Sequence, residues 1–172
     1  MVSKVRIDKI LKSLIIDELS GGIEVKGANV YVAALIAQFI RERLLDERET
    51  FSFETVMSHV SKIELFRKSK LKGYRNYLYF VATESPAINK ARVQLRIQKG
   101  GHPVGEQKIQ NRYYRSLELL LDAITLTDRA SLFDNSSDKY RLVAVVTNGR
   151  IIRLEDEKNV PAWLVKYVIN KL

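Results

Sequence analysis

One six-residue segment in the middle of the chain constrains the fold more than any other feature. Tyr77–Ala82 reads Tyr-Leu-Tyr-Phe-Val-Ala, an uninterrupted β-prone apolar run that is typical of a strand covered on both faces. Ser85 and Pro86 follow, and this pair predicts a helix start, with serine as the cap and proline at the first helical position. A buried strand that leads directly into a helix predicts an α/β fold.

The rest of the chain continues this alternation. Apolar residues at helical spacing predict helices, and short apolar runs predict strands. Asn29 is expected to cap the second helix, and Asn148-Gly149 is expected to join the last two strands as a hairpin turn. The predicted helices are residues 5–19, 30–44, 61–72, 86–99, 106–127 and a terminal helix from 161; the predicted strands are 50–54, 77–82, 130–133, 142–146 and 151–154. We therefore predict one domain over residues 1–172, with a mainly parallel sheet sandwiched between helices.

Polar residues follow three of the predicted strands. In parallel sheets, ligands bind beyond the carboxyl ends of the strands, so chemistry is expected at these positions. They are Glu54-Thr55, Thr83-Glu84-Ser85 and Asp134-Asn135. Glu54 could hold Mg²⁺ through water or orient a substrate hydroxyl, or it could be an exposed acid. Ser58 adds a hydroxyl or caps a helix, and His59 is expected to hydrogen-bond locally.

The net charge of +9 is concentrated in one third of the chain. Residues 62–115 contain 13 basic and 3 acidic side chains, whereas the other 118 residues carry a net charge of −1. Such a local excess implies an anionic partner, or alternatively a solvated basic face.

The basic segment also has a regular spacing. Arg92 and Arg96 share one helix face, and Lys108, Arg112 and Arg115 share another. Residues 99–105 lie between these two faces and form a loop with three glycines. Two arginine-bearing helices joined by such a loop could close over phosphates, because the guanidinium group binds phosphate oxygens bidentately. The alternative is two solvated helix faces joined by a flexible turn.

Several other classes of protein are poorly supported. The chain has no cysteine, and its two histidines have no zinc-ligand spacing. There is no Gly-x-Ser-x-Gly motif and no helix-turn-helix or aromatic-basic motif, so we expect neither a hydrolase nor a nucleic-acid partner. No apolar stretch is long enough for a membrane span, and no apolar run follows Met1, so we expect a cytoplasmic protein without a membrane partner.

Five stretches together resemble the zeta-toxin-like kinases, a bacterial family of P-loop kinases, over roughly residues 30–167. The stretches occur in the family's order: residues 51–59 (Phe-Ser-Phe-Glu-Thr-Val-Met-Ser-His), 77–83, Arg92 to His102, 112–117 and 133–136. The resemblance implies a P-loop-kinase-like three-layer core with a helical lid at about residues 92–115. It also implies ATP and Mg²⁺ as cofactors, a nucleotide-sugar or other small-molecule acceptor, and an antitoxin as partner.

The resemblance also assigns roles to individual residues. Glu54 matches a strand-end acid near substrate and magnesium, with Thr55, Ser58 and His59 beside the substrate. The lid arginines, among which the catalytic pair is left open, would stabilise the transferred phosphate. The lid residues are Arg92, Arg96, Gly100, Gly101, His102, Arg112 and Arg115. Asp134 and Asn135 would lie near the nucleotide.

The chain departs from this family at its beginning. The family starts with a Gly-x-x-x-x-Gly-Lys-Ser/Thr loop, whose backbone N–H groups and lysine cradle phosphates. The glycine spacing occurs at residues 22–27, which are followed by Ala28-Asn29 in place of Lys-Ser/Thr and are interpreted as a surface turn. Val56 stands where the toxins of this family have a substrate-binding threonine, and Asp8 is a candidate for the family's general base.

Two hypotheses follow. The first is an ATP-dependent small-molecule kinase, inactive in this chain because the phosphate loop is missing. The second is a non-catalytic protein that binds an anionic ligand or a partner in a basic cleft. In either case a sheet without its phosphate-loop strand would expose unpaired backbone, so we expect that place to be filled by another segment, a partner or self-association.

Overall fold

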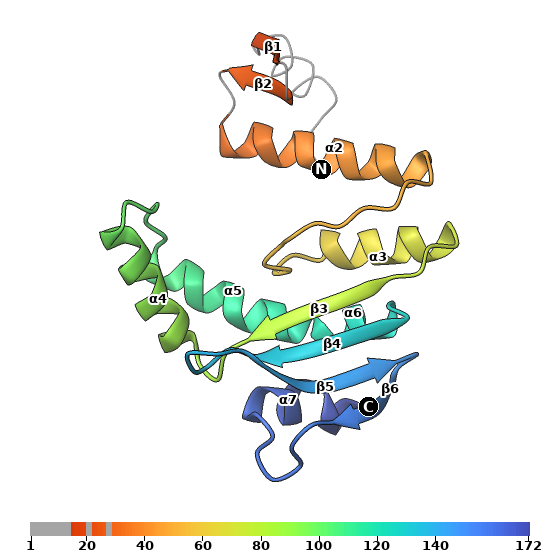
Figure 1. Ribbon diagram of the computed structural model, residues 1–172, viewed down its shortest axis with the longest axis vertical. Coiled ribbons are helices and arrows are strands. Elements are labelled where there is room, and N and C mark those ends of the chain that lie inside the picture. The colour runs from red at the N-terminus through yellow and green to blue at the C-terminus, as the bar shows by residue number, and fades with distance from the viewer. Residues whose placement is uncertain (1–14, 20–21, 27–28) are drawn as a thin grey trace. The chain divides into compact units, whose positions relative to one another are not determined.

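The computed structural model describes residues 15–19, 22–26 and 29–172, which form two compact units, residues 1–53 and 54–172. The N-terminal unit contains an antiparallel hairpin of β1 (Ile15–Leu19) and β2 (Gly22–Lys26), followed by α2 (Val30–Asp46) (Figure 1). The prediction of a single domain stays a prediction.

The hairpin corrects two sequence predictions. Ile15–Leu19 is a strand rather than the end of a helix, and Gly22–Lys26 is its partner strand rather than a surface turn. The β-branched isoleucines and valine in these two segments favour extended backbone, which explains why helical spacing misled the prediction. Residues 5–14, including the candidate base Asp8, lie outside the described residues.

The second helix is confirmed at its predicted start. The Asn29 side chain accepts hydrogen bonds from the backbone N–H groups of Tyr31 and Val32, at 3.0 and 3.1 Å, and so caps α2. The predicted strand at residues 50–54 is wrong. Residues 49–58 have no regular structure, although Phe51 and Phe53 stack with ring centroids 6.2 Å apart. Alternating residues without a partner strand do not form a ladder.

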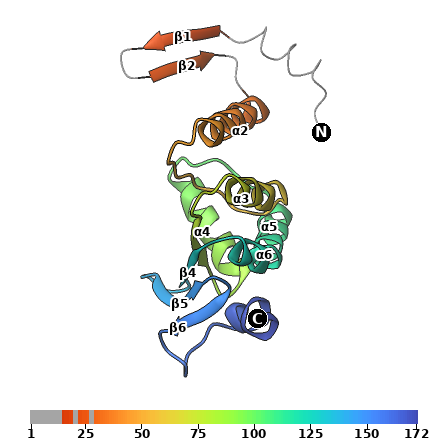
Figure 2. The ribbon, with the colours of Figure 1, turned by 90° about the vertical axis from the view of Figure 1, so that its right-hand side faces the viewer.

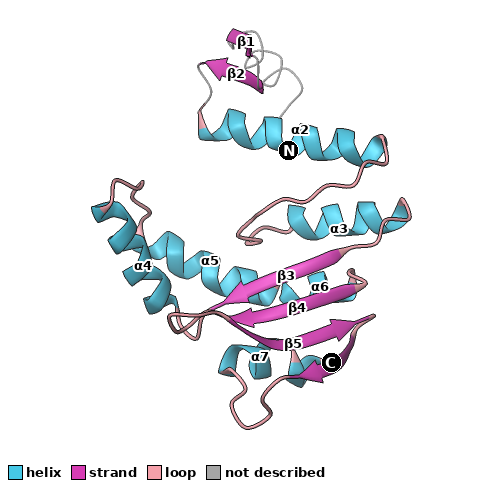
Figure 3. Ribbon diagram, in the orientation of Figure 1, coloured by secondary structure: helices cyan, strands magenta, loops and turns pink. Residues whose placement is uncertain are grey.

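The C-terminal unit is an α/β layer structure. Its elements in order are α3 (Ser61–Leu71), β3 (Tyr77–Ala82), α4 (Pro86–Gln98), α5 (Glu106–Glu118), α6 (Leu120–Thr125), β4 (Arg129–Asp134), β5 (Arg141–Thr147), β6 (Arg150–Leu154), α7 (Ala162–Tyr167) and a 3₁₀ turn (Ile169–Lys171) (Figure 3). Most predicted elements are therefore confirmed. The helix predicted over residues 106–127 is interrupted at Leu119, which divides it into α5 and α6.

The sheet order is β3–β4–β5–β6, and only the β3–β4 pair is parallel. The prediction of a mainly parallel sheet is therefore wrong for this unit. A parallel crossover needs a dozen or more residues, and α4, α5 and α6 supply that length between β3 and β4. Residues 135–140 and the Asn148-Gly149 turn are too short for a crossover, so β5 and β6 return antiparallel. Asn148 and Gly149 both have positive φ, at 49° and 73°, as the predicted tight hairpin turn requires.

The helices cover one face of this sheet. Figure 2 shows α3, α5, α6 and α7 on the same side of the strands. Their buried residues pack against the inward side chains of the strands, with Leu117, Leu120, Ile124 and Leu164 at most 1% exposed. β3 alternates between buried and exposed residues, so the prediction that both of its faces are covered is wrong for this unit. Apolar residues on an outward face give the same sequence signal as buried ones.

A buried polar network joins the end of α3 to the sheet. The Asn76 amide donates to the carbonyls of Phe66 and Leu126, at 3.2 and 3.1 Å, and its oxygen accepts from the Ser69 hydroxyl at 2.7 Å. Its backbone N–H donates to the Asp128 carboxylate at 2.7 Å. One side chain therefore fixes the entry into β3 relative to the entry into β4.

We predict that Asn76→Ala lowers the free energy of unfolding by about 2–3 kcal/mol, because it removes the three side-chain hydrogen bonds to the Ser69 hydroxyl and to the half-buried Phe66 and Leu126 carbonyls. Ser69→Ala removes a hydroxyl whose single proton is shared between the Asn76 side-chain oxygen and the Phe66 carbonyl, and it is expected to cost about 1 kcal/mol. Urea unfolding followed by circular dichroism measures both values. An Asn76→Ala protein as stable as the parent would show that the network contributes nothing.

Candidate functional site

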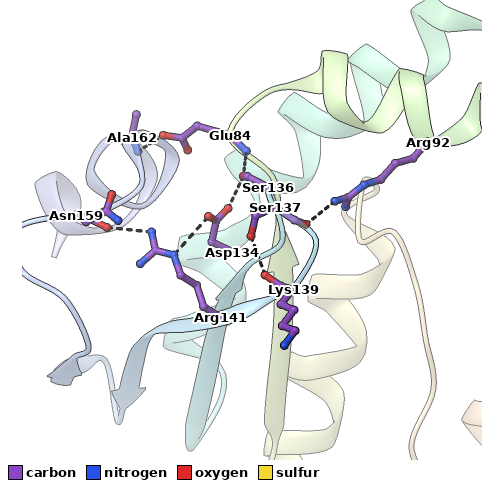
Figure 4. Close-up of polar contacts among 9 residues, drawn as sticks. All are labelled: Glu84, Arg92, Asp134, Ser136, Ser137, Lys139, Arg141, Asn159 and Ala162. Atoms are coloured by element: carbon purple, nitrogen blue, oxygen red, sulfur yellow. Dashed lines mark hydrogen bonds and ion pairs between the residues drawn. The ribbon is translucent and has the colours of Figure 1, made fainter.

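Polar residues gather where β3 and β4 end. Because these two strands are parallel and paired in register from Tyr77–Arg129 to Ala82–Asp134, their carboxyl ends lie side by side. Residues 83–85 and 134–135, which were expected to carry the chemistry, therefore lie at the same edge of the sheet. We call Glu84, Asp134, Ser136 and Arg141 the strand-end cluster (Figure 4).

Hydrogen bonds connect the strand-end cluster across the two strands. The Ser136 hydroxyl donates to the Asp134 carboxylate at 2.6 Å and accepts from the Glu84 backbone N–H at 2.8 Å. The Arg141 Nε lies 3.7 Å from the other Asp134 oxygen, and a terminal nitrogen of its guanidinium donates to the Asn159 carbonyl at 3.0 Å. Asp134 is buried, so this pairing compensates for the loss of its hydration.

Glu84 extends the network to the last helix. Its side-chain carboxylate accepts from the backbone N–H of Ala162, at the start of α7, at 2.9 Å. The Asn135 N–H donates to the Ala82 carbonyl at 2.7 Å and continues the pairing of β3 with β4 by one residue. Both acids at this edge are therefore engaged by groups of the protein itself. Among the described residues no group of three or more metal-ligating side chains gathers anywhere.

One predicted lid arginine reaches this edge. Arg92, on α4, donates from its guanidinium to the Ser137 carbonyl at 3.0 Å, directly after the strand-end cluster (Figure 4). Helical spacing places Arg96 on the same face of α4, one turn further from the strands. Lys90 and Glu106 form an ion pair of 2.7 Å that joins α4 to α5. The arrangement presents the Arg92 guanidinium beside the carboxyl ends of the parallel strands.

The glycine pair of the predicted lid has a local structural role. Gly100 has a φ of +87°, and the N–H groups of Gly100 and Gly101 donate to the carbonyls of Ile97 and Arg96, which ends α4 in a Schellman motif. A Cβ on Gly101 would lie 2.9 Å from the Arg96 carbonyl oxygen, so a side chain does not fit there. His102 follows as an exposed residue. On α5, Arg112 is half-buried and Arg115 is exposed.

The residues predicted around Glu54 do not join the strand-end cluster by any hydrogen bond within residues 29–172. Glu54 is exposed in an irregular segment instead of ending a strand. The Thr55 hydroxyl accepts from the Met57 N–H at 3.3 Å. The His59 ring accepts from the Ser61 N–H at 3.2 Å, which is the local bond expected for a histidine beside a helix start, and Ser58 is half-buried.

Tyr113, on α5, contacts the segment that follows β3. Its hydroxyl donates to the Thr83 carbonyl at 2.9 Å, and Thr83 is itself buried. Burial, followed by the neighbouring Glu84, raises the pKa of Tyr113 to about 12. The sequence did not predict this polar contact of Tyr113. Ser136 and Arg141 were also missed, because their roles depend on the β4–β5 hairpin, which the expected parallel topology excluded.

The raised pKa of Tyr113 predicts a pH dependence of stability. Tyrosine in the unfolded chain ionises near pH 10, whereas Tyr113 in the fold holds its proton up to about pH 12. Its contribution is therefore complete below pH 10 and is lost as the pH rises towards 12. We predict that the stability difference between the parent and Tyr113→Phe decreases over this interval. Urea unfolding at pH 8, 10 and 11 measures it, and a constant difference would contradict the prediction.

No family model matches the sequence. No solved structure matches it either. A protein of Haemophilus influenzae, described only as uncharacterized, is 30% identical over 63 residues, which are 37% of this chain and 45% of that protein. The match thus spans less than half the length of this relative. Among the described residues no helix is long and apolar enough to cross a membrane.

Proposed function

We propose that the chain binds a phosphorylated small molecule at the carboxyl ends of β3 and β4, with the arginines of α4 and α5 as phosphate ligands. The observation that carries the proposal is the position of Arg92, whose guanidinium lies at the strand ends against the Ser137 carbonyl. The Ser137 carbonyl accepts from one N–H group of the Arg92 guanidinium. The remaining N–H groups can donate to phosphate oxygens. The concentration of positive charge in residues 62–115 supports an anionic ligand.

We further propose that this site derives from a zeta-toxin-like ATP-dependent phosphotransferase. The resemblance in residues 51–59, 77–83, 92–102, 112–117 and 133–136 supports this family, as does the crossover through α4, α5 and α6 between two parallel strands. Transfer would use Mg²⁺-ATP, with a nucleotide-sugar or other small molecule as acceptor and an antitoxin as partner. This proposal includes a P-loop-kinase-like core of three layers, with a sheet between two layers of helices.

The alternative proposal is a non-catalytic anion-binding protein. The engagement of Glu84 and Asp134 by Ala162, Ser136 and Arg141 favours it, because the protein itself already uses both carboxylates in hydrogen bonds or an ion pair. The exposed position of Glu54 away from any strand end favours it as well. The two proposals share the arginine site and differ in whether ATP is used.

We predict that the chain binds Mg²⁺-ATP with a dissociation constant weaker than about 1 µM and does not hydrolyse it, because the sequence contains no Walker A motif. Isothermal titration calorimetry measures the affinity, and release of inorganic phosphate measures turnover. Sub-micromolar binding or steady turnover would favour the kinase over the non-catalytic protein.

We predict that Arg92→Lys weakens binding of inorganic tripolyphosphate at least about fivefold, because lysine keeps the charge but loses the bidentate fork. Arg96→Lys and Arg112→Lys are expected to weaken it in the same direction. Arg150→Lys, on an exposed residue of β6, is the matched control and is expected to change the affinity less than about twofold.

Calorimetry at one fixed salt concentration compares these variants. Equal affinities for Arg92→Lys, Arg150→Lys and the parent would contradict a phosphate site and indicate a diffuse basic surface, whose binding depends on charge and salt alone.

A further inference from the structure

β3 is an edge strand without the usual protection of an edge. The order β3–β4–β5–β6 gives it one neighbour. Its six residues contain no charged side chain and no proline, and its pairing with β4 has no bulge. The opposite edge strand, β6, carries Arg150 and Arg153. Natural proteins protect sheet edges with charges, prolines or bulges, so a long neutral edge is prone to pair with another strand.

The hydrogen bonds to β4 identify which backbone groups of β3 face this open edge. The Ala82 carbonyl accepts from the Asn135 N–H at 2.7 Å, and the Asn76 carbonyl accepts from the Asp128 N–H at 2.9 Å. Backbone groups alternate in direction along a strand, so the even-numbered residues of β3 bond to β4. The N–H and C=O groups of Tyr77, Tyr79 and Val81 therefore point to the open edge.

The same three residues place their side chains on the sheet face that the helices of this unit do not cover. Tyr77, Tyr79 and Val81 are 56%, 72% and 54% exposed. Exposed apolar side chains and unpaired backbone groups thus coincide on one strand. Within the described part of the chain, β4 is the only strand paired with β3.

We propose that β3 pairs antiparallel with β3 of a second copy of this chain, about a two-fold axis at Tyr79. Tyr79 then lies opposite Tyr79 of the other copy, and Tyr77 lies opposite Val81. Each of these pairs exchanges two backbone hydrogen bonds, because their N–H and C=O groups face outward. Two four-stranded sheets become one continuous sheet.

The composition of β3 makes it complementary to itself. The pairing sets tyrosine against tyrosine and tyrosine against valine, and aromatic and aromatic–β-branched pairs stabilise antiparallel strands. At the end of the strand, Arg75 lies opposite Thr83 of the other copy, so no like charges meet directly. This neutrality matters because two chains of net charge +9 repel each other elsewhere.

A single-stranded nucleic acid is the other ligand that this face suggests. The strand registers place Tyr77, Arg129 and Arg150 in one row across the sheet, and bases can stack on tyrosine. A nucleic acid would leave the ladder of outward N–H and C=O groups unpaired, whereas a second β3 satisfies it. We therefore infer the strand pair. Addition of a single-stranded oligonucleotide distinguishes it from nucleic-acid binding.

Cysteine cross-linking tests the pairing and its register, because the chain has no cysteine of its own. In the proposed register, Tyr79→Cys places two thiols on directly opposite residues, whose Cα atoms are about 5.5 Å apart and within reach of a disulfide. In a dimer of Tyr77→Cys, the thiols of the two copies are offset by four residues along the strands. This offset is about 13 Å, which is too far for a disulfide. Mixing Tyr77→Cys with Val81→Cys restores an opposite pair.

We expect mild oxidation to give a disulfide-linked dimer with Tyr79→Cys and with the mixed pair, at least about tenfold more than with Tyr77→Cys alone. Ile152→Cys, an exposed apolar residue on β6, measures collisional cross-linking. Equal cross-linking of Tyr79→Cys and Tyr77→Cys, or none above the Ile152→Cys level, would overturn the proposal.

Sedimentation equilibrium of the unmodified chain supplies a second measurement. We expect a monomer–dimer equilibrium whose dissociation constant rises at least about tenfold in Tyr79→Lys, which sets two ammonium groups opposite each other, and less than about twofold in Ile152→Lys. A chain that is monomeric at all concentrations, or that gains mass only when a single-stranded oligonucleotide is added, would overturn the strand pair.

Discussion

The parallel pairing of β3 with β4 is the contact on which the rest of the C-terminal unit depends. It requires a long crossover, which α4, α5 and α6 provide, and α5 and α6 of that crossover lie on the same face of the sheet as α3 and α7. It also sets the ends of the two strands side by side, so that Glu84 and Asp134 belong to one hydrogen-bonded cluster. The Asn76 network fixes the other end of the same pair.

This arrangement separates two kinds of charged residue at the strand ends. The acids are held in place by a serine, an arginine and a backbone N–H, and their main effect is to join β3, β4, β5 and α7. Arg92, on α4, lies beside them and uses one of its guanidinium N–H groups on the Ser137 carbonyl, which leaves others available. A ligand at this edge would therefore meet fixed carboxylates and available guanidinium groups, which is why we favour an anion over a metal ion as the species recognised.

The two edge strands of the sheet differ in composition. β6 carries two arginines, whereas β3 carries tyrosines and valine and has no charged side chain. β3 has one strand neighbour among the described residues, and its open edge is where the proposed second copy would add a strand. The proposed dimer and the proposed phosphate site use different groups, since the first uses the open edge and the second the carboxyl ends.

The local features of this fold could be predicted from the sequence. The Asn29 cap, the end of α4 at Gly100-Gly101, the Asn148-Gly149 hairpin and the strand at Tyr77–Ala82 each depend on a few neighbouring residues whose backbone preferences are strong. The α/β class followed from their order. The candidate site could be predicted in part, since residues 83–85 and 134–135 do meet at the strand ends.

What the sequence could not determine was which segments pair and which faces are covered. A run such as Tyr-Leu-Tyr-Phe-Val-Ala has the same composition whether helices cover one face of its sheet or both, so its exposure was decided by tertiary packing alone. The strand predicted at residues 50–54 had a suitable pattern but no partner. The roles of Ser136, Arg141 and Tyr113 arose only when β4 turned back into β5 and α5 packed beside Thr83. Local propensity is encoded in neighbouring residues, whereas pairing depends on contacts between residues far apart in the chain, and these exist only in the folded structure.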